Sequence, residues 1–180
     1  MAFFGLIGRR RHERTGFQLY GLAVSAAREP FYYERLGVPD TLDGRFDMVC
    51  LFAFLAIRRT RRIEPGGVEI AQAIFDAMFS DMDINLREMG VGDLSVPKRV
   101  RAMWEGFHGR ASVYEPAMTE PAALATALAR NVWRSDSDPA IAAAAVHLAR
   151  IAITQDQQLS GQADAALRKG VLTFLAPDSI

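Results

Sequence analysis

The chain has 180 residues, half of them apolar, and its 21 Lys and Arg balance 21 Asp and Glu to a formal net charge of zero. A chain of this length forms one hydrophobic core and buries about 70% of its unfolded surface. A single cysteine excludes an internal disulfide, and because Cys50 lies in an apolar run we expect a buried core residue there. The charge is uneven, since residues 1–62 hold eleven basic and six acidic side chains and residues 63–180 hold ten and fifteen.

The first fifteen residues join a short apolar tip to a basic cluster. This order is the reverse of a secretory signal, so we expect the protein to stay in the cytoplasm. The longest apolar run, residues 48–57, is half the roughly 20 residues of a membrane-spanning helix, and no such helix is expected. Residues 1–15 are interpreted as a flexible arm that either frays in solution or lies on an anionic membrane surface. The membrane-facing candidates in this arm are Phe3, Phe4, Arg9, Arg10 and Arg11.

The spacing of apolar residues after the arm of residues 1–15 predicts helices. The first runs from Thr15, a candidate N-cap, to about Arg28. The next long helix, at about residues 44–62, follows a cap at Thr41 or Asp43. It has almost no polar face, so it is predicted to be the central helix, surrounded by the others. A strand is the competing interpretation of an apolar run, but this run is three times as long as an ordinary strand.

Four arginines crowd the end of this central helix. Cations there offset the negative end of the helix dipole, a stabilisation of roughly 0.3–1 kcal/mol each when exposed. Four arginines are more than the end of a helix requires, so the alternative interpretation is that they form a surface that meets the membrane or an acidic protein partner. The second set of membrane-facing candidates is therefore Arg58, Arg59, Arg61 and Arg62.

Two further helices, at residues 70–89 and 97–114, are predicted to form an antiparallel pair. Gly90 suits the left-handed conformation that ends a helix, Ser95 is a candidate N-cap, and Pro97 fits a first helical turn. The side chains expected to face inward from the second helix are Val100, Met103, Trp104, Phe107, Ala111 and Tyr114.

The alanine-rich remainder predicts three more helices, which begin at Pro121, at about Pro139 and at about Gln162; residues 135–139 supply a break and a fresh N-cap before the second of them. The last of them is expected to run to Leu175. No alternation of period two, internal repeat or low-complexity linker occurs. The chain is therefore predicted to be all-α, with six to eight helices in one domain of residues 16–180.

Signatures of catalysis are missing, since the sequence contains no phosphate loop, serine elbow, cysteine pair or HExxH motif. Glu105 and His108 have the Glu-x-x-His spacing of di-iron bundles, but such a site needs a second copy and two further carboxylates. Asp81 and Asp83 cannot share a helix face and are expected on a solvated edge. We therefore predict a binding protein with no catalytic residues, no metal, no cofactor and no nucleic-acid partner.

Two long motifs carry a resemblance to a known family. The first begins at Tyr33 and reads YERLGVPDTLDGRFDM; the second begins at Phe79 and reads FSDMDINLREMGVGDLSVPKRVRAMWEGFHGRASVYE. Together they place residues 33–116, nearly half the chain, in a segment that resembles the ubiquinol-cytochrome c chaperone family. The resemblance implies a non-enzymatic assembly factor for the respiratory cytochrome bc complex. It would bind apo or nascent cytochrome b at the inner face of the cytoplasmic membrane, and a small partner protein, known for mitochondrial members, is left open.

The resemblance implies no catalytic residues, so candidate partner-binding residues come from physical reasoning. An apolar groove rimmed by charge can hold hydrophobic or charged segments reversibly. Candidates for such a rim surround the central turn: Arg87, Glu88, Asp93, Lys98 and Arg99. Solvation or an internal ion pair is the alternative for each. The alternative functions are a helical adaptor that docks on an acidic protein and a small helical metalloenzyme.

Overall fold

A computed structural model describes the backbone of residues 2–135 and 137–180 and the side chains of residues 12–135 and 137–180. Within these ranges the regular structure is entirely helical, which confirms the predicted all-α class. The long helices are α1 (Ala2–Ala27), α3 (Leu42–Thr60), α4 (Gly67–Glu88), α5 (Val96–Ala117) and α7 (Pro139–Ser160). The short elements are α2 (Pro30–Glu34), α6 (Pro121–Leu128), the π-helical turn η1 (Ala129–Trp133), α8 (Asp164–Leu167) and the 3-10 turn η2 (Pro177–Ser179).

Helix α3 is the central helix, as its apolar pattern predicts. Every side chain from Met48 to Ala56 is buried, because α1, α4, α5 and α7 all contact this helix. Its first turn is capped by Thr41, whose hydroxyl oxygen accepts the Gly44 N–H at 3.1 Å. Cys50 is buried there as expected, and burial raises the pKa of its thiol.

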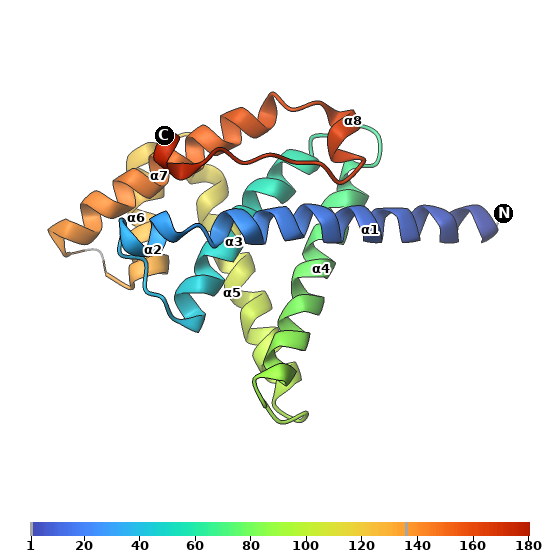
Figure 1. Ribbon diagram of the computed structural model, residues 1–180, viewed down its shortest axis with the longest axis horizontal. Helices are drawn as coiled ribbons and strands as arrows, with labels where there is room; N and C mark the ends of the chain where they lie inside the picture. Colours follow the sequence, from blue (N-terminus) through green and yellow to red (C-terminus); the bar gives the residue numbers. More distant parts are fainter. Residues whose placement is uncertain (1, 136) are drawn as a thin grey trace.

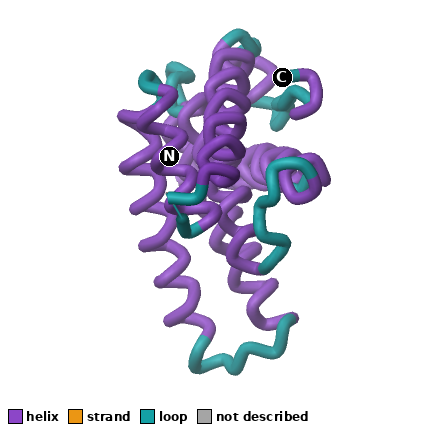
Figure 2. The backbone as a smooth tube through the Cα atoms, turned by 90° about the vertical axis from the view of Figure 1, so that its left-hand side faces the viewer, coloured by secondary structure: helices purple, strands orange, loops and turns teal. Residues whose placement is uncertain are grey.

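Helices α4 and α5 form a hairpin that extends away from the rest of the bundle and ends in the turn between them (Figures 1 and 2). Gly90 ends α4 with a left-handed φ of 78°, and the Val91 N–H returns to the Leu86 carbonyl at 3.0 Å. Ser95 stands at the predicted N-cap of α5, but its backbone is already helical and its side chain makes no capping bond. The hairpin was predicted correctly, apart from this cap.

Helix α1 begins much earlier than its expected start at Thr15. That residue is buried inside the helix, and its hydroxyl donates to the Arg168 carbonyl at 3.4 Å instead of capping α1. The division into an arm of residues 1–15 and a domain of residues 16–180 stays a prediction. The arm candidates Phe3, Phe4, Arg9, Arg10 and Arg11 have side chains outside the described ones.

The C-terminal segment also differs from expectation. The helix predicted for residues 162–175 is reduced to the short α8, and residues 171–176 are not helical. Gln162 accepts the Thr173 N–H at 2.9 Å and donates to its carbonyl at 2.6 Å, and Gln155 bonds the N–H and carbonyl of Leu175 in the same way. These side chains of α7 satisfy the tail's backbone, so it has no need to form a helix. Figure 1 shows the tail running beside α7.

Candidate partner-binding grooves

Helix α5 lies between two grooves. Few of its side chains are buried, namely Val96, Phe107, Tyr114 and Ala117, so most of its surface remains accessible. One groove is lined by positions 104, 108, 111 and 115 of α5, and the other by positions 99, 103, 106 and 110. At about 100° per residue these two sets point roughly 150° apart, so the grooves lie on nearly opposite faces of the helix.

The larger groove, here called the arginine groove, has a volume of about 880 Å³ and lies between the end of α3, the start of α4 and the second half of α5. Its apolar lining includes Phe54, Ile57, Val68, Phe75, Trp104 and Phe107. Its charged rim consists of Arg58, Arg61, Arg62 and Glu115. Concave apolar surfaces of this size with a few charges at the edge are the usual form of a binding site.

Aromatic rings give this groove its shape. Phe75 of α4 meets Phe107 of α5 edge to face, with ring centroids 5.6 Å apart, and Trp104 lies on His108 with centroids 4.1 Å apart. The expectation that Trp104 faces inward was wrong, because 45% of this residue is exposed. It lines the groove that α3, α4 and α5 leave open. Val68 at the start of α4 is even more exposed, at 63%, so the groove presents apolar surface to solvent.

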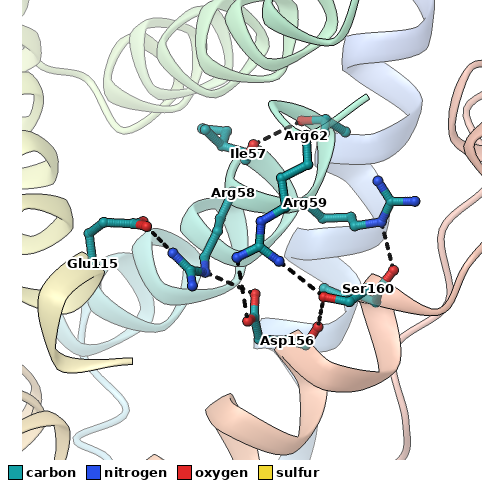
Figure 3. A network of polar contacts seen from close by, with 9 residues as sticks. Ile57, Arg58, Arg59, Arg62, Glu115, Asp156 and Ser160 are labelled. Atoms are coloured by element: carbon teal, nitrogen blue, oxygen red, sulfur yellow. Dashed lines mark hydrogen bonds and ion pairs between the residues drawn. The ribbon is translucent and has the colours of Figure 1, made fainter. Parts of the chain in front are cut away.

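The four arginines at the end of α3 have different environments, and Figure 3 labels three of them, Arg58, Arg59 and Arg62. Arg58 donates to Asp156 at 3.1 Å and also to Glu115, so two carboxylates compensate it. Arg59 is 5% exposed and donates to the carbonyls of Leu159 and Gln162 at 2.8 and 2.6 Å and to Asp164 at 2.6 Å. Its burial corrects the expectation that this side chain faces the membrane. Its charge instead offsets the negative end of α7.

The other two arginines face solvent. Arg62 is half-exposed, donates to the Ser160 hydroxyl at 3.1 Å and lies 4.0 Å from Asp156. Arg61 is exposed and makes no side-chain hydrogen bond or ion pair with any residue whose side chain the structure describes. The rim of the arginine groove therefore carries positive charge at both residues, and among the described side chains that of Arg61 is uncompensated.

The smaller groove, here called the methionine groove, has a volume of about 390 Å³. Its apolar lining includes Leu42, Phe46, Met82, Met89 and Met103, and its arginines are Arg99, Arg110 and Arg134. Methionine side chains adapt to irregular apolar surfaces. Arg110 and Arg134 both donate to the buried carboxylate of Asp47, the second of them at 2.7 Å, so these two charges are compensated.

The predicted partner-binding residues surround the turn of the α4–α5 hairpin. Arg87 donates to Asp83 at 2.6 Å and to Asp93 at 2.5 Å, which places two of the five candidates, Arg87 and Asp93, in internal ion pairs. Glu88 and Lys98 are exposed, and only Arg99 lines one of the grooves. Sequence reasoning did not identify the arginine groove as a whole, although it singled out both Trp104 and the arginines that line it. The sequence signal that could have revealed this groove was the apolar face that α4 and α5 share.

The described residues also bear on metal ligation and on membrane spanning. Across that part of the chain, no three His, Cys, Asp or Glu side chains gather so as to hold a metal ion, and Glu105 accepts from Arg101 at 3.0 Å. Asp81 was expected on a solvated edge, but it accepts the Tyr20 hydroxyl at 2.7 Å and so joins α4 to α1. No described helix has the length and apolar character that crossing a bilayer requires.

An all-α bundle with two apolar grooves that carry charge at their edges is typical of helical proteins that bind a partner. A family model described as ubiquinol-cytochrome C chaperone matches residues 34–174, and the chain belongs to that family. The resemblance seen in residues 33–116 is thereby confirmed, and the match extends it through the alanine-rich region.

Two relatives agree with this assignment. The crystal structure of the Cbp3 homolog from Brucella abortus superimposes with a TM-score of 0.83 at 33% sequence identity, covering 99% of each chain. Ubiquinol-cytochrome-c reductase complex assembly factor 1 of Xenopus laevis is 24% identical over 125 residues, which are 69% of this chain. The match spans 62% of the length of that curated relative.

Proposed function

We propose that this protein is a non-enzymatic chaperone that assists assembly of ubiquinol-cytochrome c reductase by binding newly made cytochrome b. The observation that carries the proposal is the family match over residues 34–174, supported by the Xenopus relative, whose name describes an assembly factor of that complex. The arginine groove supports it chemically. A chaperone for an apolar client needs exposed apolar surface that is still soluble, and this groove combines Val68 and Trp104 with a charged rim.

The proposed place of action is the inner face of the cytoplasmic membrane, with the protein bound peripherally. Cytochrome b is embedded in the bilayer, so its chaperone has to reach that surface. The excess of basic residues in the first 62 positions supports this location, because anionic lipids attract each nearby Lys or Arg by about 1 kcal/mol. A small partner protein stays an open part of the proposal.

Deletion of the gene tests the proposal. We expect the deletion strain to lose the cytochrome b signal in reduced-minus-oxidised heme spectra, and a plasmid copy to restore it. A copy carrying Val68→Asp should restore it poorly, because the charge enters the apolar lining of the groove. The matched control is Val146→Asp, an equally exposed valine of α7 outside the groove, which should restore it fully. Normal cytochrome b in the deletion strain would refute the proposal.

A second candidate function is a helical adaptor that docks on an acidic protein. The exposed, uncompensated Arg61 beside the half-exposed Arg62 favours it, because these charges would attract carboxylates. The same deletion strain separates the two functions. An adaptor of another pathway would leave cytochrome b at its normal level, whereas the assembly chaperone would not.

A further inference from the structure

The arginine groove differs from the site that holds the C-terminal tail in what it offers to a backbone. At the tail, the amides of Gln155 and Gln162 bond both the N–H and the carbonyl of Leu175 and Thr173. These pairs recognise an extended chain by its backbone, in the manner of an added strand. The tail site therefore shows that this protein holds an extended segment through paired hydrogen bonds to its backbone.

The arginine groove has no such groups. Its walls are mostly helical, so the backbone groups along the middle of α3, α4 and α5 are already paired; those at the end of α3 and in the first turn of α4 are the exception. The Gln72 amide donates to Asp76 at 2.7 Å, and the Ser112 hydroxyl donates to the Gly109 carbonyl at 2.9 Å. An extended segment in this groove would lose water from its N–H and carbonyl groups and would find few partners for them. A helical segment would not, because it pairs its own backbone.

The dimensions of the groove also suit a helix. Its α5 wall runs from Trp104 to Glu115, which is about 16 Å at 1.5 Å per residue, or three helical turns. The apolar side chains along this wall and along the start of α4 can cover one face of an amphipathic helix, as in other helix-in-groove complexes.

Charge sets the preferred flank of that helix. Arg59 is buried; of the rest, Arg58, Arg61 and Arg62 carry three positive charges and the neighbouring Glu115 and Asp156 two negative ones, so the rim keeps one net positive charge, beside Arg61 and the half-exposed Arg62. The C-terminal end of α3 contributes about half a negative charge, which this net positive charge exceeds. An occupant with carboxylates beside these arginines would be attracted, and one with ammonium groups there would be repelled.

We infer that the arginine groove binds a helical segment with one continuous apolar face and with Asp or Glu on the flank that lies beside Arg61 and Arg62. The inference rests on the proposed function, whose client it describes by chemistry. It assigns to Arg61 and Arg62 the choice of partner, and to Val68, Phe75 and Trp104 the apolar contact.

Designed peptides test the inference on the full-length protein. Three labelled 18-residue helices share one leucine face and differ only on the flank, which carries Glu, Gln or Lys. We expect fluorescence anisotropy at low salt to give an affinity about fivefold higher for the Glu peptide than for the Lys peptide, since two exposed ion pairs are involved. The difference should shrink as salt screens the charges. Equal affinities of the three peptides at low salt would overturn the inference.

Protein variants assign the effect to the groove. Arg61→Glu with Arg62→Glu should reverse the order of the peptides, whereas Arg150→Glu on α7, an exposed arginine outside both grooves, should leave it unchanged. Circular dichroism checks that each variant is folded; if the double Glu variant is not, Arg61→Gln with Arg62→Gln should abolish the preference. Val68→Asp should lower the affinity for all three peptides, whereas Val146→Asp should leave all three affinities unchanged. A preference that survives both double variants would contradict the assignment.

The helical conformation has its own test. A proline at the centre of the Glu peptide breaks its helix and should reduce the affinity at least tenfold. The unmodified peptide should gain helical circular dichroism on binding. Equal binding of the proline peptide would show that the occupant is not a helix.

The outcomes for the inference and for the proposed function are distinguishable. Loss of cytochrome b in the deletion strain with no peptide preference would leave the chaperone function standing and reject this client chemistry. A clear peptide preference with normal cytochrome b in the deletion strain would do the reverse.

Discussion

Asp47 is fully buried and joins three separate parts of the chain. It lies in α3, accepts from Arg110 of α5 and accepts from Arg134 just after η1. Burial raises the pKa of its carboxyl, against the opposing effect of the two guanidiniums. The Nε of Arg110 is itself buried without a hydrogen-bond partner, so this guanidinium depends on Asp47 for compensation.

We expect Asp47→Asn to lower the free energy of unfolding by about 3 kcal/mol, because it leaves the mostly buried Arg110 without its counterion. Urea denaturation followed by circular dichroism measures the change. The control is Asp40→Asn, which removes the exposed ion pair with Arg45 and should have little effect. A loss at Asp47 no larger than that at Asp40 would mean that the pair contributes nothing.

Two glycines of α1 test how this helix packs against α4. A Cβ on Gly16 would lie 2.4 Å from the Ala73 carbonyl carbon, so the helices would have to separate, whereas a Cβ on Gly21 would meet nothing within 4 Å. We expect Gly16→Ala to destabilise by about 1–3 kcal/mol and Gly21→Ala to stabilise by up to about 1 kcal/mol. Thermal denaturation should therefore show shifts of opposite sign. Shifts of the same sign would indicate that α1 does not approach α4 this closely.

The glutamine pairs of α7 hold the tail in place. Removing the buried Gln155 leaves the N–H and carbonyl of Leu175 unpaired, so Gln155→Ala should cost about 1–2 kcal/mol and speed hydrogen exchange at the Leu175 amide. Gln162→Ala should do the same at Thr173. Gln72→Ala on α4, which removes only an exposed bond to Asp76, is the control and should leave both amides protected. Unchanged exchange at Leu175 in the Gln155 variant would contradict this role.

The whole molecule carries an excess of positive charge in its first 62 residues and of negative charge in the remainder. The burial of Arg59 and the ion pairs of Arg58 reduce what the end of α3 can offer to a membrane. We therefore expect the N-terminal cluster Arg9, Arg10 and Arg11 to supply most of the attraction, about 1 kcal/mol for each charge near anionic lipid.

Liposome flotation measures this attraction. The full-length protein should float with anionic vesicles, should be released as salt shortens the screening length below about 10 Å, and should stay behind with neutral vesicles. The triple variant of Arg9, Arg10 and Arg11 to Gln should lose flotation. The matched triple variant of Lys98, Arg99 and Arg101 to Gln, at the start of α5, should retain it. No flotation of the unaltered protein at low salt would refute a membrane role.

Local signals predicted most of the secondary structure. The N-caps of α3, at one of two candidate residues, and of α7, within residues 135–139, act within a few residues, as do the left-handed end at Gly90 and the apolar run of α3, so these features are readable from the sequence. The family was also recognisable from two long motifs, and the comparisons confirm it.

The tertiary structure decided which of these side chains are buried and which are exposed. Arg59 is buried because Asp164, 105 positions later, meets it, and Trp104 is exposed because it lines the groove that α3, α4 and α5 leave open. The tail is extended because Gln155 and Gln162 of α7 take over its backbone bonds. Each outcome depends on which distant segments meet, whereas a helical pattern records only that a face is apolar. The arginine groove is therefore a property of the packed helices, although the sequence alone determined the helices that line it.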